Sequence, residues 1–101
     1  MAPKLSVQEI RRRGYEWPKC ALVEEYAVIE EGQVDLSTTI ENLRSSRSFY
    51  RRQLNEAYAF KTSTGADYTD FTDRFDEYVR MERELGQAIA YVEEIVEALA
   101  P

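Results

Sequence analysis

The sequence contains no histidine, and its only cysteine is Cys20. Without histidine, a Ser-His-Asp triad, a histidine general base and a Cys/His zinc site are excluded. A single cysteine rules out a disulfide within the chain, and an unpaired thiol agrees with a reducing compartment. An enzyme that uses carboxylates as acid and base would need a pocket, which a slender helical protein rarely has. We therefore expect no enzyme, no metal site and no cofactor.

Long apolar runs are also missing. No stretch approaches the roughly 18–20 apolar residues of a membrane-spanning helix. Residues 1–13 carry basic side chains, but no apolar run of about 7–15 residues follows them, as a signal peptide requires. We expect a soluble protein of the cytoplasm or a virion, with no membrane partner and no secretion by a signal peptide.

The 101 residues are 44% hydrophobic and 32% charged, which is typical of one globular domain. Period-two alternation is absent for more than a few residues, so we expect no strands. The predicted fold is an all-α three-helix bundle over residues 18–101, with an N-terminal arm over residues 1–17.

Two heptad patterns, which predict a pair of long helices, run over residues 35–62 and 67–100. A short polar turn containing Gly65 joins them, and Asp67 is placed to cap the second helix. Two long helices joined by a short turn pack antiparallel. Mostly apolar residues at spacings of three and four form the two seams, which are Leu36, Ile40, Leu43, Arg47, Tyr50, Leu54, Ala57 and Lys61, and Tyr68, Phe71, Phe75, Tyr78, Glu82, Leu85, Ile89, Val92, Val96 and Leu99.

A second apolar stripe on the last helix calls for a third helix to cover it, and consists of Met81, Ala88 and Ile95. The candidate is residues 18–31, with Pro18 in its first turn and an apolar stripe of Leu22, Val23, Tyr26 and Ile29. Ser6 and Glu9 form a capping-box pattern that predicts a short helix over residues 6–13. Gly14 and Gly32 are expected at helix C-termini. Gly86 lies inside a helical pattern, where it is expected to be either a site of close helix packing or a tolerated weak point.

Arg47 and Glu82 are the charged residues in the middle of the two seams. An antiparallel register places them about one helical turn apart, beside Tyr50. Either they form a buried polar layer with the Tyr50 hydroxyl, or they reach the edge of the hairpin and pair in partial solvent. Both arrangements predict proximity, and we expect the pair to set the register.

The N-terminal arm combines positive charge with aromatic residues, since residues 1–20 hold five basic and two acidic residues. Arg11, Arg12 and Arg13 could contact phosphates while Tyr15 or Trp17 stacks on bases. Alternatively, the two aromatic residues fold back over the bundle. The net charge of −6 disfavours nucleic acid as a partner.

Charge is polarised between the two long helices. Residues 35–61 hold five basic and three acidic residues, whereas residues 62–101 hold three basic and ten acidic residues. The acidic run that begins at Asp67 lacks the alternating spacing of a calcium loop, so it predicts a solvated helix start. Together with the arm, the candidate partner surface comprises basic residues and aromatic residues outside the seams, which are Arg44, Arg51, Arg52, Phe49, Tyr58, Phe60 and Tyr91.

These observations favour a non-enzymatic helical protein that binds a protein partner or copies of itself, and a small viral or phage structural or accessory component fits this size. Two alternatives stay open. One is a nucleic-acid-associated regulator that uses the basic aromatic arm. The other is an acidic inhibitor that docks on a basic partner surface.

Overall fold

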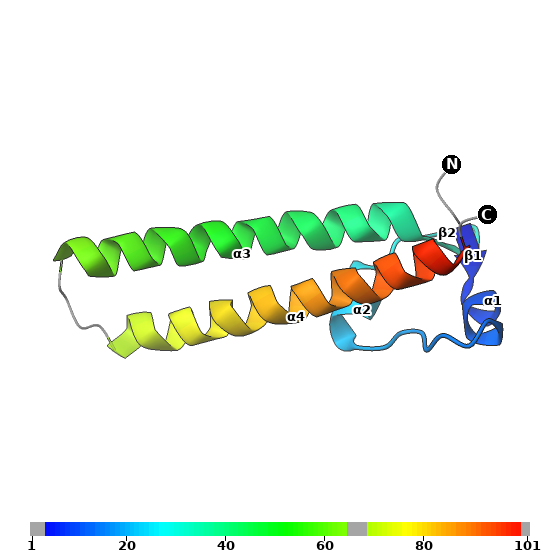
Figure 1. Ribbon diagram of the computed structural model, residues 1–101, viewed down its shortest axis with the longest axis horizontal. Helices are drawn as coiled ribbons and strands as arrows, with labels where there is room; N and C mark the ends of the chain where they lie inside the picture. The colour runs from blue at the N-terminus through cyan, green and yellow to red at the C-terminus, as the bar shows by residue number, and fades with distance from the viewer. Residues whose placement is uncertain (1–3, 65–68, 100–101) are drawn as a thin grey trace.

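The computed structural model describes residues 4–64 and 69–99, with side chains for residues 4–59 and 75–99. In chain order the elements are β1 (Lys4–Ser6), α1 (Val7–Arg12), α2 (Ala21–Tyr26), β2 (Ile29–Glu30), β3 (Gln33–Asp35), α3 (Leu36–Thr64) and α4 (Thr69–Leu99). Helices α3 and α4 form an antiparallel hairpin along the long axis of a molecule that measures 53 × 22 × 22 Å (Figure 1). The predicted helical class and the hairpin are therefore confirmed.

The ends of the helices follow from local capping. Ser6 Oγ accepts a hydrogen bond from the Glu9 amide at 3.1 Å, as the capping-box pattern predicted. Asp35 Oδ1 accepts from the Thr38 amide at 3.1 Å, which fixes the start of α3. Gly14 has φ 94° just after α1, as expected of a C-terminal glycine. The predicted turn at Gly65 and the cap at Asp67 lie outside the described residues.

The prediction that the chain has no strands is wrong. Strands β1, β3 and β2 form an antiparallel sheet in that order, with Leu5 opposite Val34 and Ile29 opposite Val34 on the other side. Glu31 and Gly32 join β2 to β3 and have φ values of 54° and 77°. A type I′ hairpin turn requires positive φ at both of its central residues, so Gly32 serves a hairpin and not a helix end.

The third helix is consequently shorter than predicted. Residues 18–31 contain only α2, and Pro18 lies in the loop before it rather than in its first turn. Leu22 and Val23 are buried as expected, whereas Ile29 lies in β2 and is 56% exposed. Strands of two or three residues are too short to show period-two alternation, and the apolar residues of this segment also fit a helical period.

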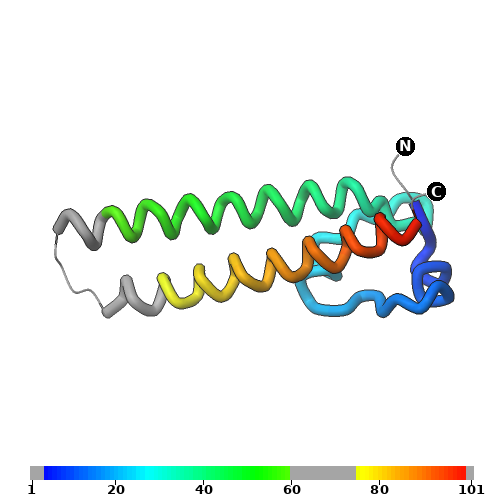
Figure 2. The backbone as a smooth tube through the Cα atoms, viewed as in Figure 1, coloured from blue at the N-terminus to red at the C-terminus, as the bar shows by residue number. Residues whose placement is uncertain are grey.

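The buried core occupies the half of the hairpin in which α3 begins and α4 ends. We call this half the base, comprising residues 36–47 of α3, residues 84–99 of α4 and the N-terminal segments packed on them (Figure 2). Ala88 and Ile95 of the second stripe are buried there, and Met81 packs against the core at its margin. The buried apolar residues are Ile10, Trp17, Leu22, Val23, Val34, Leu36, Ile40, Leu43, Leu85, Ala88, Ile89, Val92 and Ile95.

Beyond the base, the hairpin continues without a buried core in its described part. In residues 48–59 of α3 and 75–83 of α4, every side chain is partly or fully exposed. We call these residues the distal hairpin. Among the described segments, only α3 and α4 run through this half of the molecule (Figure 1).

The unequal burial predicts unequal costs for the same substitution. Leu43→Ala should lower the free energy of unfolding by about 2–5 kcal/mol, because Leu43 is fully buried and its truncation leaves a cavity in the core. Leu54→Ala, at a partly exposed seam position, should cost roughly 1 kcal/mol or less. Urea denaturation of both variants measures the difference, and equal costs would show that the core extends into the distal hairpin.

Candidate functional site

Glu82 binds two arginines of α3. Its Oε1 accepts hydrogen bonds from Nε of Arg47 and from Nε of Arg51, each at 2.8 Å. The structure thus brings Arg47 and Glu82 together, in agreement with the predicted register. The side chains of Arg47 and Glu82 are 30% and 21% exposed, so the pair lies at the hairpin edge in partial solvent and is not a buried layer.

Gly86 makes room for this ion cluster. A Cβ atom built on Gly86 would lie 2.8 Å from Cζ of Arg47, so the guanidinium group rests directly against the α4 backbone. This contact accounts for a glycine in the interior of a long helix, where it is otherwise unfavourable by about 1 kcal/mol relative to alanine.

Tyr50 belongs to an aromatic cluster. Its ring centroid lies 5.3 Å from that of Phe49 and 5.5 Å from that of Tyr78. Burial, followed by the charges of Tyr26 and Glu77, raises the pKa of Tyr50 above its usual value, and Glu25 contributes in the same direction. The sequence did not single out Glu25 or Glu77 as neighbours of this cluster.

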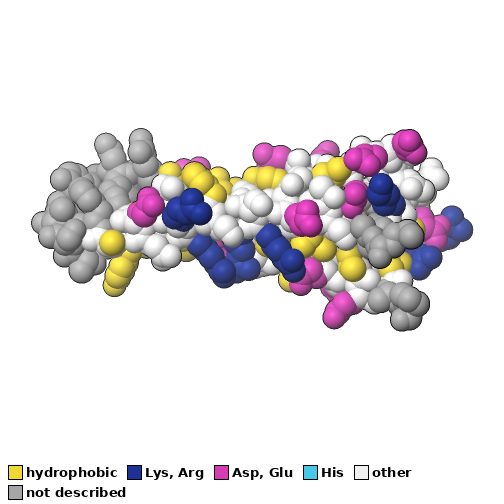
Figure 3. Space-filling model, turned by 90° about the horizontal axis from the view of Figure 1, so that it is seen from above, with side chains coloured by type: hydrophobic (Ala, Val, Ile, Leu, Met, Phe, Trp, Pro, Cys, Tyr) yellow, Lys and Arg dark blue, Asp and Glu magenta, His cyan; other side chains and the backbone are white. Residues whose placement is uncertain are grey.

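Three large apolar side chains of the distal hairpin are exposed. Phe49 is 51% exposed, Tyr58 is 66% exposed and Val79 is 41% exposed. Figure 3 shows apolar side chains on the surface of this half and a gathering of basic side chains near the middle of the hairpin. Phe60, another candidate surface residue, lies outside the described side chains.

The basic residues of the N-terminal arm have partners within the chain. Arg11 donates from Nε and Nη2 to the carbonyl oxygen of Trp17 at 2.9 and 2.5 Å. Arg12 and Arg13 pair with Glu9 at 2.6 and 3.1 Å.

The aromatic residues of this arm face the base. Trp17 is only 4% exposed and Tyr15 packs against the same core, so the arm folds back over the bundle. The prediction that Trp17 belongs to the partner surface is therefore wrong, because its apolar ring is more stable in the core than in water.

Tyr91 fastens the loop between α1 and α2 to α4. Its hydroxyl donates to the carbonyl oxygen of Glu16 at 2.6 Å, and Lys19 Nζ lies 4.4 Å above its ring. Burial, partly offset by this hydrogen bond, raises the pKa of Tyr91. Tyr91 is partly buried and holds the chain's own N-terminal segment, which takes it out of the candidate partner surface.

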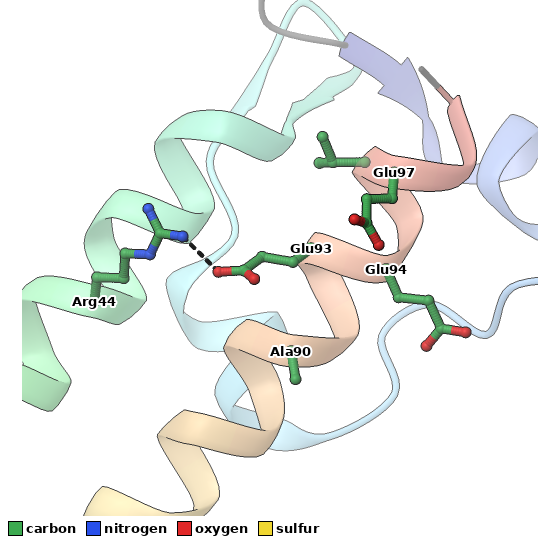
Figure 4. A pocket seen from close by; sticks show the side chains of 6 residues that line it. Arg44, Ala90, Glu93, Glu94 and Glu97 are labelled. Atoms are coloured by element: carbon green, nitrogen blue, oxygen red, sulfur yellow. Dashed lines mark hydrogen bonds and ion pairs between the residues drawn. The ribbon is translucent and has the colours of Figure 1, made fainter. Parts of the chain in front are cut away.

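The remaining arginines of the candidate surface differ in their contacts. Arg44 pairs with Glu93 at 2.5 Å across an open hollow of about 400 Å³ between α3 and α4 (Figure 4). Arg51 binds Glu82, and Arg52 is exposed. Opposite charges on α3 and α4 therefore pair within the hairpin at two levels. Part of the predicted charge polarisation between the two helices thus stabilises the hairpin itself.

The described residues show neither a metal-binding cluster nor a membrane-spanning helix. In residues 4–59 and 75–99, no group of three or more Asp, Glu or Cys side chains is arranged to hold a metal ion. The predicted solvated run Asp67, Asp70 and Asp73 lies outside the described side chains. No helix in the described part of the chain is long and apolar enough to cross a membrane.

Comparison of the chain with protein-family models, with curated proteins and with solved structures finds no match.

The Glu82 cluster predicts a specific dependence of stability on pH. Partial burial raises the pKa of Glu82, but the hydrogen bonds and charges of Arg47 and Arg51 lower it more, so the net pKa is below the usual value. A lowered pKa stabilises the folded state above the unfolded pKa of about 4.3, and this contribution is lost as pH falls through the folded pKa. Glu82→Gln should therefore lower the free energy of unfolding by about 1 kcal/mol at neutral pH and leave it unchanged in strong acid.

Urea titrations of the wild type and Glu82→Gln across this pH range measure the effect. Glu84→Gln is the control, because Glu84 lies two residues away on α4 and is also partly exposed. A Glu82→Gln cost that persists unchanged to about pH 2 would contradict the ion cluster.

Proposed function

We propose that this chain is a non-enzymatic protein-interaction module that presents its distal hairpin to another protein. The observation that carries the proposal is the contrast between the two halves of one hairpin. Most seam residues of the base are buried, whereas no described side chain of the distal hairpin is, although the heptad seam continues there.

A two-helix hairpin buries less apolar surface than a bundle, because each helix has only one neighbour. In the base, α2 and the sheet supply further neighbours. In the distal hairpin, Phe49, Tyr58 and Val79 keep large apolar areas in water. Aromatic side chains on an otherwise polar surface are typical of protein interfaces. A partner that covers these side chains would be stabilised on the distal hairpin by the removal of their apolar surface from water.

The N-terminal arm offers less support for a nucleic-acid contact. Each of its three consecutive arginines has an intramolecular acceptor, and Trp17 is buried. Phosphate binding would have to replace these contacts in a chain with a net charge of −6. Cys20 is exposed and unpaired, so we propose a reducing setting such as the cytoplasm or the inside of a virion.

Site-specific photocrosslinking in the native source tests the proposal. A photoreactive phenylalanine analogue at position 49 or 58 should give a covalent adduct with a protein. The same analogue at Glu41 or Glu97, which are exposed positions of the base, should give little or none. Mass spectrometry of the adducts tells another protein from a second copy of this chain.

Adducts confined to the base positions, or adducts with nucleic acid, would overturn the proposal. No adduct at positions 49 and 58, with circular dichroism showing folded variants, would overturn it as well.

A further inference from the structure

One face of the hairpin is covered by a helix in the base. Cys20, Ala21 and Leu22 lie beside Glu84 and Gln87 of α4, where together they line a cavity. At the other end of α2, the Tyr26 hydroxyl lies 2.8 Å from Ser46 Oγ of α3 in a hydrogen bond. Helix α2 therefore crosses the hairpin from α4 to α3 and covers this face at the level of Ser46 and Glu84.

The same face continues beyond α2 into the distal hairpin. On α3, residues 46, 49, 50 and 53 share one side of the helix, and on α4 residues 77, 78, 81 and 84 do so, because each set follows the helical period. We call the part beyond α2 the aromatic face, consisting of Phe49, Tyr50, Gln53, Tyr78 and Met81. The described N-terminal segments run beside the base and do not extend along the distal hairpin (Figure 2).

Carboxylates border the aromatic face. Glu25 directly precedes Tyr26, whose hydroxyl lies 2.8 Å from Ser46 Oγ, and Glu77 directly precedes Tyr78, whose ring centroid lies 5.5 Å from that of Tyr50. The charges of both carboxylates contribute to raising the pKa of Tyr50. Of the arginines at this level, Arg47 and Arg51 are bound to Glu82, and Arg80 is exposed on α4 three residues after Glu77. A surface of aromatic rings with acidic margins attracts lysine and arginine, both by charge and over the ring faces.

The base already shows this chemistry on the same line of α4. Residues 77, 84 and 91 are seven apart, so they lie along one side of the helix. Over Tyr91, the chain's own N-terminal loop places Lys19 at 4.4 Å from the ring. At Tyr91, this side of α4 is therefore covered by a basic side chain that lies above an aromatic ring.

We infer that the aromatic face binds an amphipathic helix of a partner protein, one whose apolar stripe is flanked by lysine or arginine. This inference rests on the proposed function and names the partner's chemistry. The partner's apolar side chains pack on Phe49, Tyr50 and Tyr78, and its basic side chains meet Glu25 and Glu77. A second copy of this chain fits less well, because it would bring the same carboxylates against one another.

Two synthetic helical peptides of about three heptads test the inference with the full chain. Both carry leucine at the seam positions; one carries lysine at the flanking positions and the other carries glutamate. The lysine peptide should bind and shift the amide NMR signals of Phe49, Tyr50 and Tyr78, whereas the glutamate peptide should bind at least tenfold more weakly.

Matched variants distinguish binding of the lysine peptide at the aromatic face from its general attraction to an acidic protein. The double variant Glu25→Gln and Glu77→Gln should bind the lysine peptide roughly three- to tenfold more weakly than the wild type. The double variant Glu94→Gln and Glu97→Gln in the base should bind it as well as the wild type. Phe49→Ala should weaken binding, whereas Tyr58→Ala should not. Residues 49 and 58 are nine apart on α3 and so lie on opposite sides of the helix.

Equal binding of the two peptides, or shifts confined to the base or to the side of Tyr58, would overturn the inference. Those results leave the proposed function intact if the photocrosslinks at position 49 or 58 are still found. Crosslinks that join two copies of this chain at position 49 would overturn the inference in favour of self-association.

Discussion

Apolar burial ends part-way along one continuous hairpin, and the other features of the structure depend on that limit. Leu43 and Leu85 are fully buried, while Tyr50 and Tyr78, each about two helical turns further along the hairpin, are only partly buried. The helices do not end there, because α3 and α4 run on with the same seam. Packing of an amphipathic face, rather than helix propensity, supplies most of the stability of a helix. The distal hairpin therefore owes its structure largely to the base.

The Glu82 cluster lies where this change occurs. A carboxylate that receives two guanidinium groups holds α3 and α4 in one register at the point where the hydrophobic contacts thin out. Gly86 removes the side chain that would keep Arg47 away from α4. A wholly apolar seam would tolerate a shift by a heptad, whereas this set of charges matches in one register only.

Much of the architecture could be predicted from the sequence, because heptad spacing is a strong signal over four or more turns. The proximity of Arg47 and Glu82 followed from that spacing alone. The sheet could not be predicted in this way, because its strands have two or three residues and Glu31 is an unusual residue for a type I′ turn. The burial of individual aromatic residues could not be predicted from the sequence either. Trp17 and Phe49 are both large and apolar, and only the position of the N-terminal segments buries one and exposes the other.

Amide hydrogen exchange of the isolated chain tests most directly whether the distal hairpin lacks support of its own. Local opening exposes amides with a free energy set by the contacts that must break. We predict that the amides of residues 50–58 and 76–82 exchange at least about tenfold faster, after correction for intrinsic rates, than those of residues 40–46 and 86–95. Equal protection along both helices would contradict the account, because the distal hairpin would then be as well packed as the base.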